Sequence, residues 1–397
     1  MGMNKKYRGY RSYQYLDSRK DYREFKLWQG RDEWKYEIPL SKSEEEKVLE
    51  IARESLVISL HDHPIVLPDD ISELFEYIRE GRVFTGYEEL SNSPLDAVFD
   101  NLLDGMATIT SKAGWKWTDI IHDLGMKLSD IAHQDFIIRG ESVEDISTAH
   151  KEGKLAIIPT LESATAIENE IDRVDVLYGL GIRMMGLVYS EANQLGGGLK
   201  EDRDGGLTDF GHEVVERMNK LGMVIDVSHC GDQTSLDAIE ASKDPIFITH
   251  CGARALWNIK RLKPDDVIQA CGEKGGVIGI EAAPHTTITK NHPEHSIESV
   301  MEHFEYCVDL VGIDHVGFGP DTLYGDHVGL HHVFSKHLSI KKAFTVHKEV
   351  PYVKGMENPT EAWWNIIRWL VKHGYSDNEI KKVIGGNALR ILRRIWG

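Results

Sequence analysis

Residues 222–253, GMVIDVSHCGDQTSLDAIEASKDPIFITHCGA, contain two short β-branched runs, and each run stops at a histidine, His229 or His250. Residues 233–243, which lie between these runs, have the length and composition of one helix. The pattern predicts a β-α-β unit with an imidazole at the carboxyl end of each of two parallel strands. Ligands and catalytic groups collect at that end of parallel sheets, and imidazole is the commonest metal ligand, so the unit predicts a metal centre.

Further short apolar runs, separated by helix-length segments, extend this pattern along the chain. The expected strands cover residues 56–60, 105–110, 155–161, 184–189, 223–228, 246–249, 276–280 and 315–318. Eight strands alternating with helices favour a closed α/β fold, the (β/α)8 TIM barrel, over an open doubly wound sheet. The first strand is not followed by a glycine-rich phosphate loop, which weakens the open-sheet alternative. We therefore predict a surface-lying N-terminal extension over residues 1–40 and one barrel domain over residues 41–397, including the C-terminal helices.

The composition is that of a soluble globular protein, with 41% hydrophobic and 28% charged residues among 397. A net charge of −18 disfavours nucleic acid and anionic membrane surfaces as partners.

The four cysteines are too few and too unevenly spaced for a disulfide framework, so we expect a reducing, cytoplasmic compartment. No apolar run reaches the roughly 18 residues that cross a membrane. The aromatic residues of the extension are compatible with contact to a partner subunit in a homo-oligomer.

Polar residues fall at the carboxyl ends of the expected strands. The first strand runs into His61-Asp62-His63, and alternation in an extended chain turns the two histidines to one side and Asp62 to the other. Glu162 ends the third strand, and Asp321 follows the eighth. Each carboxylate taken alone could be a helix cap. Four histidines and two carboxylates at one end of a barrel instead match a two-metal hydrolase centre with a bridging carboxylate.

The chain resembles the membrane (renal) dipeptidases, which are zinc-dependent members of the amidohydrolase superfamily. The similarity extends from about residue 59 to residue 396 and is densest in residues 205–211, 221–229, 245–250, 315–321 and 385–387. The resemblance implies a (β/α)8 barrel that holds two divalent metal ions, with zinc expected, at the carboxyl ends of its strands.

Metal ligands follow from the resemblance by matching motifs. His61 and His63 correspond to ligands of the first ion, Glu162 to the bridging carboxylate, and His229 and His250 to ligands of the second ion. The family's first motif is His-x-Asp, whereas this chain has His-x-His. A neutral ligand in place of an anionic one raises the positive charge at the first metal, which should make bound water more acidic.

Three further residues receive roles from the same resemblance. Asp321 corresponds to an aspartate that contacts the first metal and handles the proton, and Arg261 to an arginine that holds the substrate's terminal carboxylate. The alternative for Arg261 is a surface ion pair with Asp265 or Asp266. Tyr189 ends the fourth strand where the family has a histidine that stabilises the tetrahedral intermediate, and a phenol can also donate a hydrogen bond to an oxyanion.

The leading functional hypothesis is hydrolysis of an amide or peptide bond in a small, carboxylate-bearing, dipeptide-like substrate by a metal-bound hydroxide. The alternatives are a one-metal lyase or decarboxylase on the same barrel and, less favoured, a metal-binding pseudoenzyme. Three long loops are expected to form the walls and lid of the pocket, at residues 65–104, 282–296 and 322–358.

Overall fold

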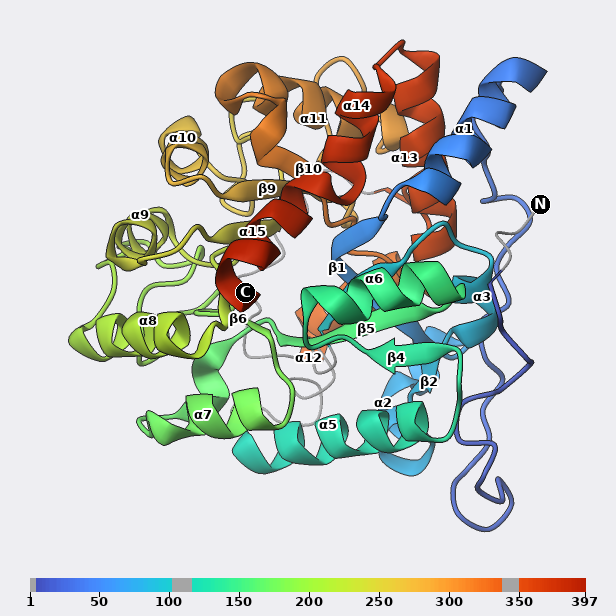
Figure 1. Ribbon diagram of the computed structural model, residues 1–397. Coiled ribbons are helices and arrows are strands. Elements are labelled where there is room, and N and C mark those ends of the chain that lie inside the picture. The colour runs from blue at the N-terminus through green and yellow to red at the C-terminus, as the bar shows by residue number, and fades with distance from the viewer. Residues whose placement is uncertain (1–4, 102–115, 338–349) are drawn as a thin grey trace.

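The computed structural model describes residues 5–101, 116–337 and 350–397 and has the predicted α/β architecture (Figure 1). The barrel strands are parallel and are β1 (Ile58–Val66), β3 (Ala97–Asn101), β5 (Leu155–Leu161), β6 (Met184–Gly186), β7 (Val224–Asp226), β8 (Phe247–Cys251), β9 (Val277–Ile280) and β10 (Val316–Phe318). Their hydrogen-bonded order is β10-β9-β8-β7-β6-β5-β3-β1, so each strand lies beside the next along the chain. This curled sheet with alternating helices confirms the predicted fold class.

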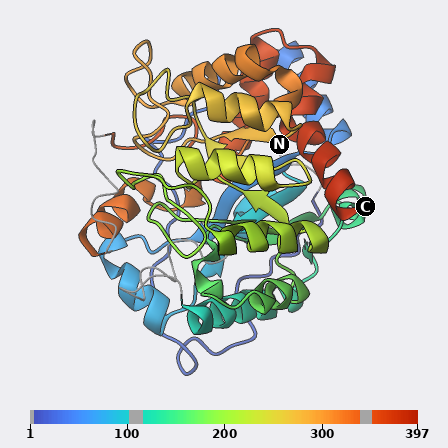
Figure 2. The ribbon, with the colours of Figure 1, turned by 90° about the vertical axis from the view of Figure 1, so that its left-hand side faces the viewer.

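Helices surround the sheet, as the view in Figure 2 shows for the side that carries α8 to α11. The α-helices are α1 (Lys42–Glu54), α2 (Leu74–Glu80), α3 (Tyr87–Ser91), α5 (Trp117–Ala132), α6 (Val143–Glu152), α7 (Asp172–Gly179), α8 (Asp209–Leu221), α9 (Asp232–Ala241), α10 (Asp265–Glu273), α11 (Ile297–Val311), α12 (His327–His337), α13 (Pro359–Lys372), α14 (Asp377–Lys381) and α15 (Asn387–Trp396). Local sequence fixes their ends: Thr208 caps α8 through its side chain, and Gly222 ends that helix in the left-handed region at φ 74°.

Helices and strands lie within two of the segments that the sequence analysis expected to be loops. Residues 65–104, expected as a loop, contain α2, β2 (Phe84–Thr85), α3 and β3, and residues 322–358 contain β11 (Leu323–Tyr324) and α12. All of them except the 11-residue α12 have seven residues or fewer and are too short to show a hydrophobic period. The strand expected at residues 105–110 lies outside the described residues, and the strand between β1 and β5 is β3.

The first and last barrel strands are joined by the segment that follows β10. The amide of Asp321 donates to the carbonyl of His61 at 3.0 Å, and the amide of His63 donates to the carbonyl of Thr322 at 2.8 Å. Gly319 makes this approach possible, because a Cβ there would lie 2.1 Å from the Thr249 carbonyl oxygen. The next strand, β11, then pairs in parallel with the carboxyl-terminal part of β1, where His63 lies opposite Leu323 and Val66 lies opposite Tyr324.

The interior of the barrel is apolar towards the amino ends of the strands. Buried Phe99, Met184 and Phe247 fill it, together with Leu389 from α15. Trp396 at the end of α15 stacks on Phe99 with ring centroids 6.2 Å apart. Helix α15 therefore covers this end of the barrel (Figure 1), and polar groups in the interior gather at the opposite, carboxyl end.

Residues 5–40 run along the outside of this chain's own barrel. The hydroxyl of Tyr10 donates to the buried carboxylate of Asp130 in α5 at 2.7 Å. The amide of Trp28 donates to the Leu67 carbonyl at 2.9 Å. The amide of Ile38 donates to the side chain of Asn365 in α13 at 3.0 Å. The described part of the extension is thus anchored at several points.

Candidate metal centre

The two histidines of β1 turn to the same side, into the barrel mouth. His61 is fully buried, and its Nε2 lies 3.1 Å from Nε2 of His63. Asp62, between them, points the other way and accepts hydrogen bonds from the Thr322 hydroxyl at 2.7 Å and from Nε1 of Trp363 at 3.1 Å. Because successive side chains of an extended strand point to opposite sides, the imidazoles of His61 and His63 face the barrel mouth, while the buried carboxylate of Asp62 has a structural role on the other side.

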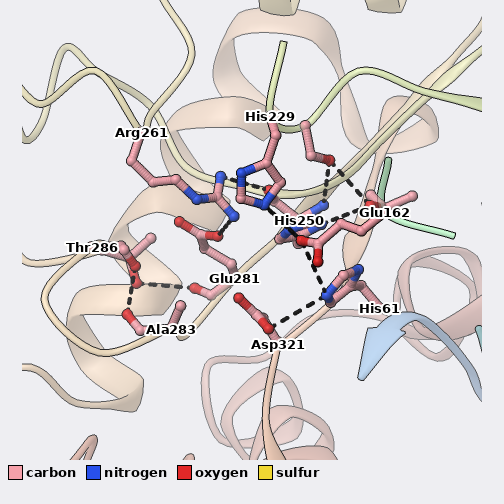
Figure 3. Close-up of polar contacts among 12 residues, drawn as sticks. His61, Glu162, His229, His250, Arg261, Glu281, Ala283, Thr286 and Asp321 are labelled. Carbon is pink, nitrogen blue, oxygen red and sulfur yellow. Dashed lines mark hydrogen bonds and ion pairs between the residues drawn. The ribbon is translucent and has the colours of Figure 1, made fainter. Parts of the chain in front are cut away.

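Glu162, which follows β5, lies between His61 and a second pair of histidines, His229 and His250 (Figure 3). Its Oε1 is 2.6 Å from Nε2 of His229, 3.0 Å from Nε2 of His250 and 4.0 Å from Nε2 of His61. His229 follows β7 and His250 lies in the neighbouring β8, whereas Glu162 comes from β5, on the other side of β6. The other oxygen, Oε2, is buried without a hydrogen-bond partner among the described residues.

Asp321 follows β10 and faces the histidines of β1. Its Oδ1 lies 2.9 Å from Nε2 of His63 and 3.4 Å from Nε2 of His61. Its backbone has φ 57°, in the left-handed region that non-glycine residues seldom adopt. Ser190, whose hydroxyl lies 3.0 Å from Nδ1 of His229, is also left-handed at φ 60°. Such strained residues cluster at functional sites, where the surrounding structure holds them in place.

The pKa shifts of four groups in the site favour the deprotonated forms that can coordinate a divalent cation, and that of His63 does not. Burial would raise the pKa of Glu162, but the imidazoles around it, His229 foremost, hold that pKa well below its usual value. Burial would also raise the pKa of Asp321, and the two histidines of β1 hold it well below the ordinary range. Burial lowers the pKa of His229 and, more strongly, that of His250. For His63, burial would lower the pKa, but pairing with Asp321 raises it.

The donor set as a whole fits metal ions. Two groups of three side chains have ligand atoms within 4.8 Å of one another: His61, His250 and Asp321, and Glu162, His229 and His250. Ring nitrogens and carboxylate oxygens that converge so closely are the ligands that zinc and similar ions take. The unpartnered Oε2 of Glu162 adds an acceptor that a bound cation would satisfy.

Side chains behind the histidines, which the sequence reasoning missed, fix how the imidazoles are turned. Thr249 donates its hydroxyl proton to Asp226 at 2.8 Å, so its oxygen must accept from Nδ1–H of His250, also 2.8 Å away. Nε2 of His250 is thereby left unprotonated towards Glu162. On β3, the side-chain amide of Asn101 contacts Nδ1 of His61 at 2.7 Å.

Arg261 and Tyr189 border the same space. The Arg261 guanidinium forms an ion pair with the fully buried carboxylate of Glu281 and donates to the His250 carbonyl at 3.1 Å. The alternative of a surface ion pair with Asp265 or Asp266 is therefore wrong. Tyr189 stacks on His229 with ring centroids 4.3 Å apart and an interplanar angle of 25°.

Glu281, at the end of β9, was not among the residues predicted for the site. Burial raises the pKa of its carboxyl group to about 7, although Arg261 opposes this shift. The signal was present in the sequence, since a glutamate directly after the apolar run VIGI ends a strand in the same way as Glu162.

The fold and this site together define a (β/α)8-barrel protein of the amidohydrolase type with a candidate metal centre. Residues 50–396 match the family model of the membrane dipeptidases, peptidase family M19, so the chain belongs to that family. The family is metal-dependent. Within the described residues, no helix has the length and apolar character needed to cross a membrane.

Individual proteins are also similar to this chain in sequence or in fold. The chain is 26% identical over 284 residues to the dipeptidase aclJ of Aspergillus oryzae, and the match covers 69% of this chain and 61% of that protein's length. Among solved structures, an amidohydrolase from Pseudomonas aeruginosa is 27% identical with a TM-score of 0.72, covering 88% of this chain and 99% of its own. A metallopeptidase from Rhodobacter sphaeroides, bound to a phosphinate mimic of L-Ala-D-Ala, shares the fold at 19% identity and a TM-score of 0.66, covering 86% and 100%.

Thr249→Val tests the support behind His250. Valine has the same shape but removes the oxygen that accepts from Nδ1–H, so we expect zinc affinity to fall about 10- to 100-fold. Competition with a chromogenic chelator measures the affinity. Ser242→Ala, which removes a buried hydroxyl bonded to the Asp244 carbonyl next to the amino end of β8, is the matched control. Equal zinc affinity in the two variants would contradict this role.

Proposed function

We propose that this protein is a metal-dependent hydrolase that cleaves a peptide or amide bond in small, dipeptide-like substrates. The observation that carries the proposal is the position of Glu162, whose Oε1 lies within 4.0 Å of imidazole nitrogens from both histidine pairs. Membership of the M19 family supports it, as does the dipeptide mimic held by the Rhodobacter relative.

We assign the ligands as two sets that share one carboxylate. His61, His63 and Asp321 would hold one ion, His229 and His250 the other, and Glu162 would bridge them. Zinc is the expected ion because the ligands are imidazoles and carboxylates. Divalent ions bound there would polarise the scissile carbonyl and lower the pKa of a water molecule.

The chain's own residues would then move the proton and hold the substrate. The carboxylate of Asp321 would accept a proton from the attacking water and release it to the leaving nitrogen. The Tyr189 hydroxyl would donate a hydrogen bond to the oxygen that becomes negative in the transition state. Burial, together with Glu162 and Asp321, raises the pKa of Tyr189 well above its usual value, so its proton stays available for this bond. Arg261 would bind the carboxyl end of the substrate.

We also propose that the protein works in a reducing compartment, the cytoplasm, without nucleic acid as a partner. All four cysteines are free and buried, as is usual for thiols in such compartments. The net charge of −18 opposes binding to phosphate backbones. Recovery of the protein from a compartment outside the cytoplasm on cell fractionation would overturn the proposed location.

The direct test combines metal analysis with a substrate screen. Protein loaded with excess zinc and then desalted should retain two ions per chain and hydrolyse members of a panel of dipeptides, N-acyl amino acids and cyclic amides. Protein stripped by a chelator should lose this activity and recover it on reloading. One ion per chain without hydrolysis would favour the lyase alternative instead.

Asp321→Asn isolates the proton-transfer role. The amide can still coordinate weakly but cannot accept a proton, so we expect metal content to be largely retained while turnover falls about 10²- to 10⁴-fold. Elemental analysis and initial rates on the best substrate of the panel measure the two effects. Turnover close to that of the unmodified enzyme would make Asp321 a structural residue.

Tyr189→Phe isolates the hydroxyl, because the phenyl ring can keep its stacking on His229. If the hydroxyl stabilises a developing oxyanion, kcat should fall about 10²- to 10³-fold with little change in metal content. The family has a histidine at this position, so we expect poor turnover of plain L,L- and L,D-dipeptides and better turnover of another amide. Strong dipeptide turnover that survives the substitution would refute both expectations.

A further inference from the structure

The space beside Arg261 that is proposed to hold the carboxyl end of the substrate is here called the carboxyl-end subsite. The ion pair between Arg261 and Glu281 changes which chemical groups this subsite can recognise. Arg261 comes from the segment after β8 and Glu281 from the end of β9, and Figure 3 shows the two side chains meeting beside Asp321. The Glu281 side chain is fully buried, and only 15% of the Arg261 side chain is exposed. The positive charge expected to attract a substrate carboxylate is therefore already matched by a carboxylate of the protein itself.

The second oxygen of Glu281 indicates what the subsite still lacks. Oε1 is buried and has no hydrogen-bond partner among the residues that the structure describes. The hydroxyl of Thr286, close by in Figure 3, donates to the Ala283 carbonyl at 2.6 Å instead. A buried carboxylate oxygen without a donor is costly, and a ligand that brings an N–H group would satisfy it.

Arg261 retains donors for the ligand's other atom. A guanidinium carries five N–H groups, and two of its nitrogens are engaged here, one by Glu281 and one by the His250 carbonyl. The subsite thus offers N–H donors beside an acceptor. A primary carboxamide complements both, because its oxygen accepts from Arg261 while its N–H donates to Oε1 of Glu281. A free carboxylate would bring a second negative charge against Oε1.

We propose that Glu281 is a specificity-determining residue that makes the carboxyl-end subsite favour an amide-terminated substrate over one with a free carboxylate. This inference rests on the proposed function, in that the ligand is dipeptide-like and its carboxyl end faces Arg261. It deepens that function by naming the substrate class: small peptides or amides whose carboxyl end is capped as a carboxamide.

The test compares two non-hydrolysable ligands, phosphinate mimics of one dipeptide with either a free carboxylate or a primary carboxamide at the carboxyl end. Binding to the zinc-loaded protein is measured by calorimetry at pH 8.5, where the Glu281 carboxyl, with its pKa of about 7, is ionised. The unmodified protein should bind the carboxamide more tightly than the acid. Equal affinity for the two mimics, or tighter binding of the acid, would overturn the proposal without any variant.

Glu281→Gln supplies the second measurement. It removes the negative charge while keeping the size of the side chain, so Arg261 becomes an uncompensated cation. The ratio of acid to carboxamide affinity should then rise about tenfold or more, because charges a few ångströms apart in a largely buried site interact more strongly than they do in water. Glu281→Asp retains the charge and should keep the original ratio. An unchanged ratio in the Gln variant, with zinc content and thermal unfolding intact, would refute the role of Glu281.

The binding readout separates this proposal from the proposed function. Binding of both mimics with the predicted ratio, but no hydrolysis of any peptide or amide, would overturn only the hydrolase assignment. Hydrolysis of dipeptides together with a strong acid preference would overturn only the role of Glu281. Failure of both mimics to bind would overturn the subsite.

Discussion

The hydrogen bond from the Asp321 amide to the His61 carbonyl is the contact on which the site depends. It joins residues 260 positions apart in the chain, closes the gap between the first and last barrel strands, and brings a carboxylate beside two imidazoles. The other site residues lie at or near the ends of barrel strands, and the order of those strands around the barrel is completed by this contact. Asp321, which makes this contact, has a left-handed φ of 57°, a strained conformation that the surrounding structure must hold in place.

One end of the barrel interior is packed with apolar side chains that stabilise the fold, and the other end carries the polar groups of the candidate site. Phe99, Met184 and Phe247 fill the amino-terminal part, and α15 seals it with apolar side chains. The carboxyl end carries buried histidines and carboxylates, which are expensive to bury unless they are paired or coordinate an ion. A well-packed lower layer supplies the rigidity that keeps the ligand atoms of the upper layer within a few ångströms of one another.

The sequence was sufficient for the fold class, because most strands are short apolar runs, and for the residues that converge, because several of these runs end near a polar residue such as Glu162 or His250. It did not reveal β3 or the helices within residues 65–104, which are too short to show a period. It also missed Glu281 and Thr249. The place of Glu281 at a strand end could be predicted from the sequence, but its pairing with Arg261 and the bond of Thr249 to Asp226 arise only on folding.

The alternation of β1 has a mechanical consequence. Asp62 lies between two candidate ligands and accepts a hydrogen bond from Trp363 of α13. Helix α13 also binds the N-terminal extension, because its Asn365 accepts a hydrogen bond from the amide of Ile38. One helix thus touches both a peripheral segment and the strand that aims two imidazoles. Because both hydrogen bonds end on α13, the outlying extension and the strand that carries two candidate ligands share one structural support.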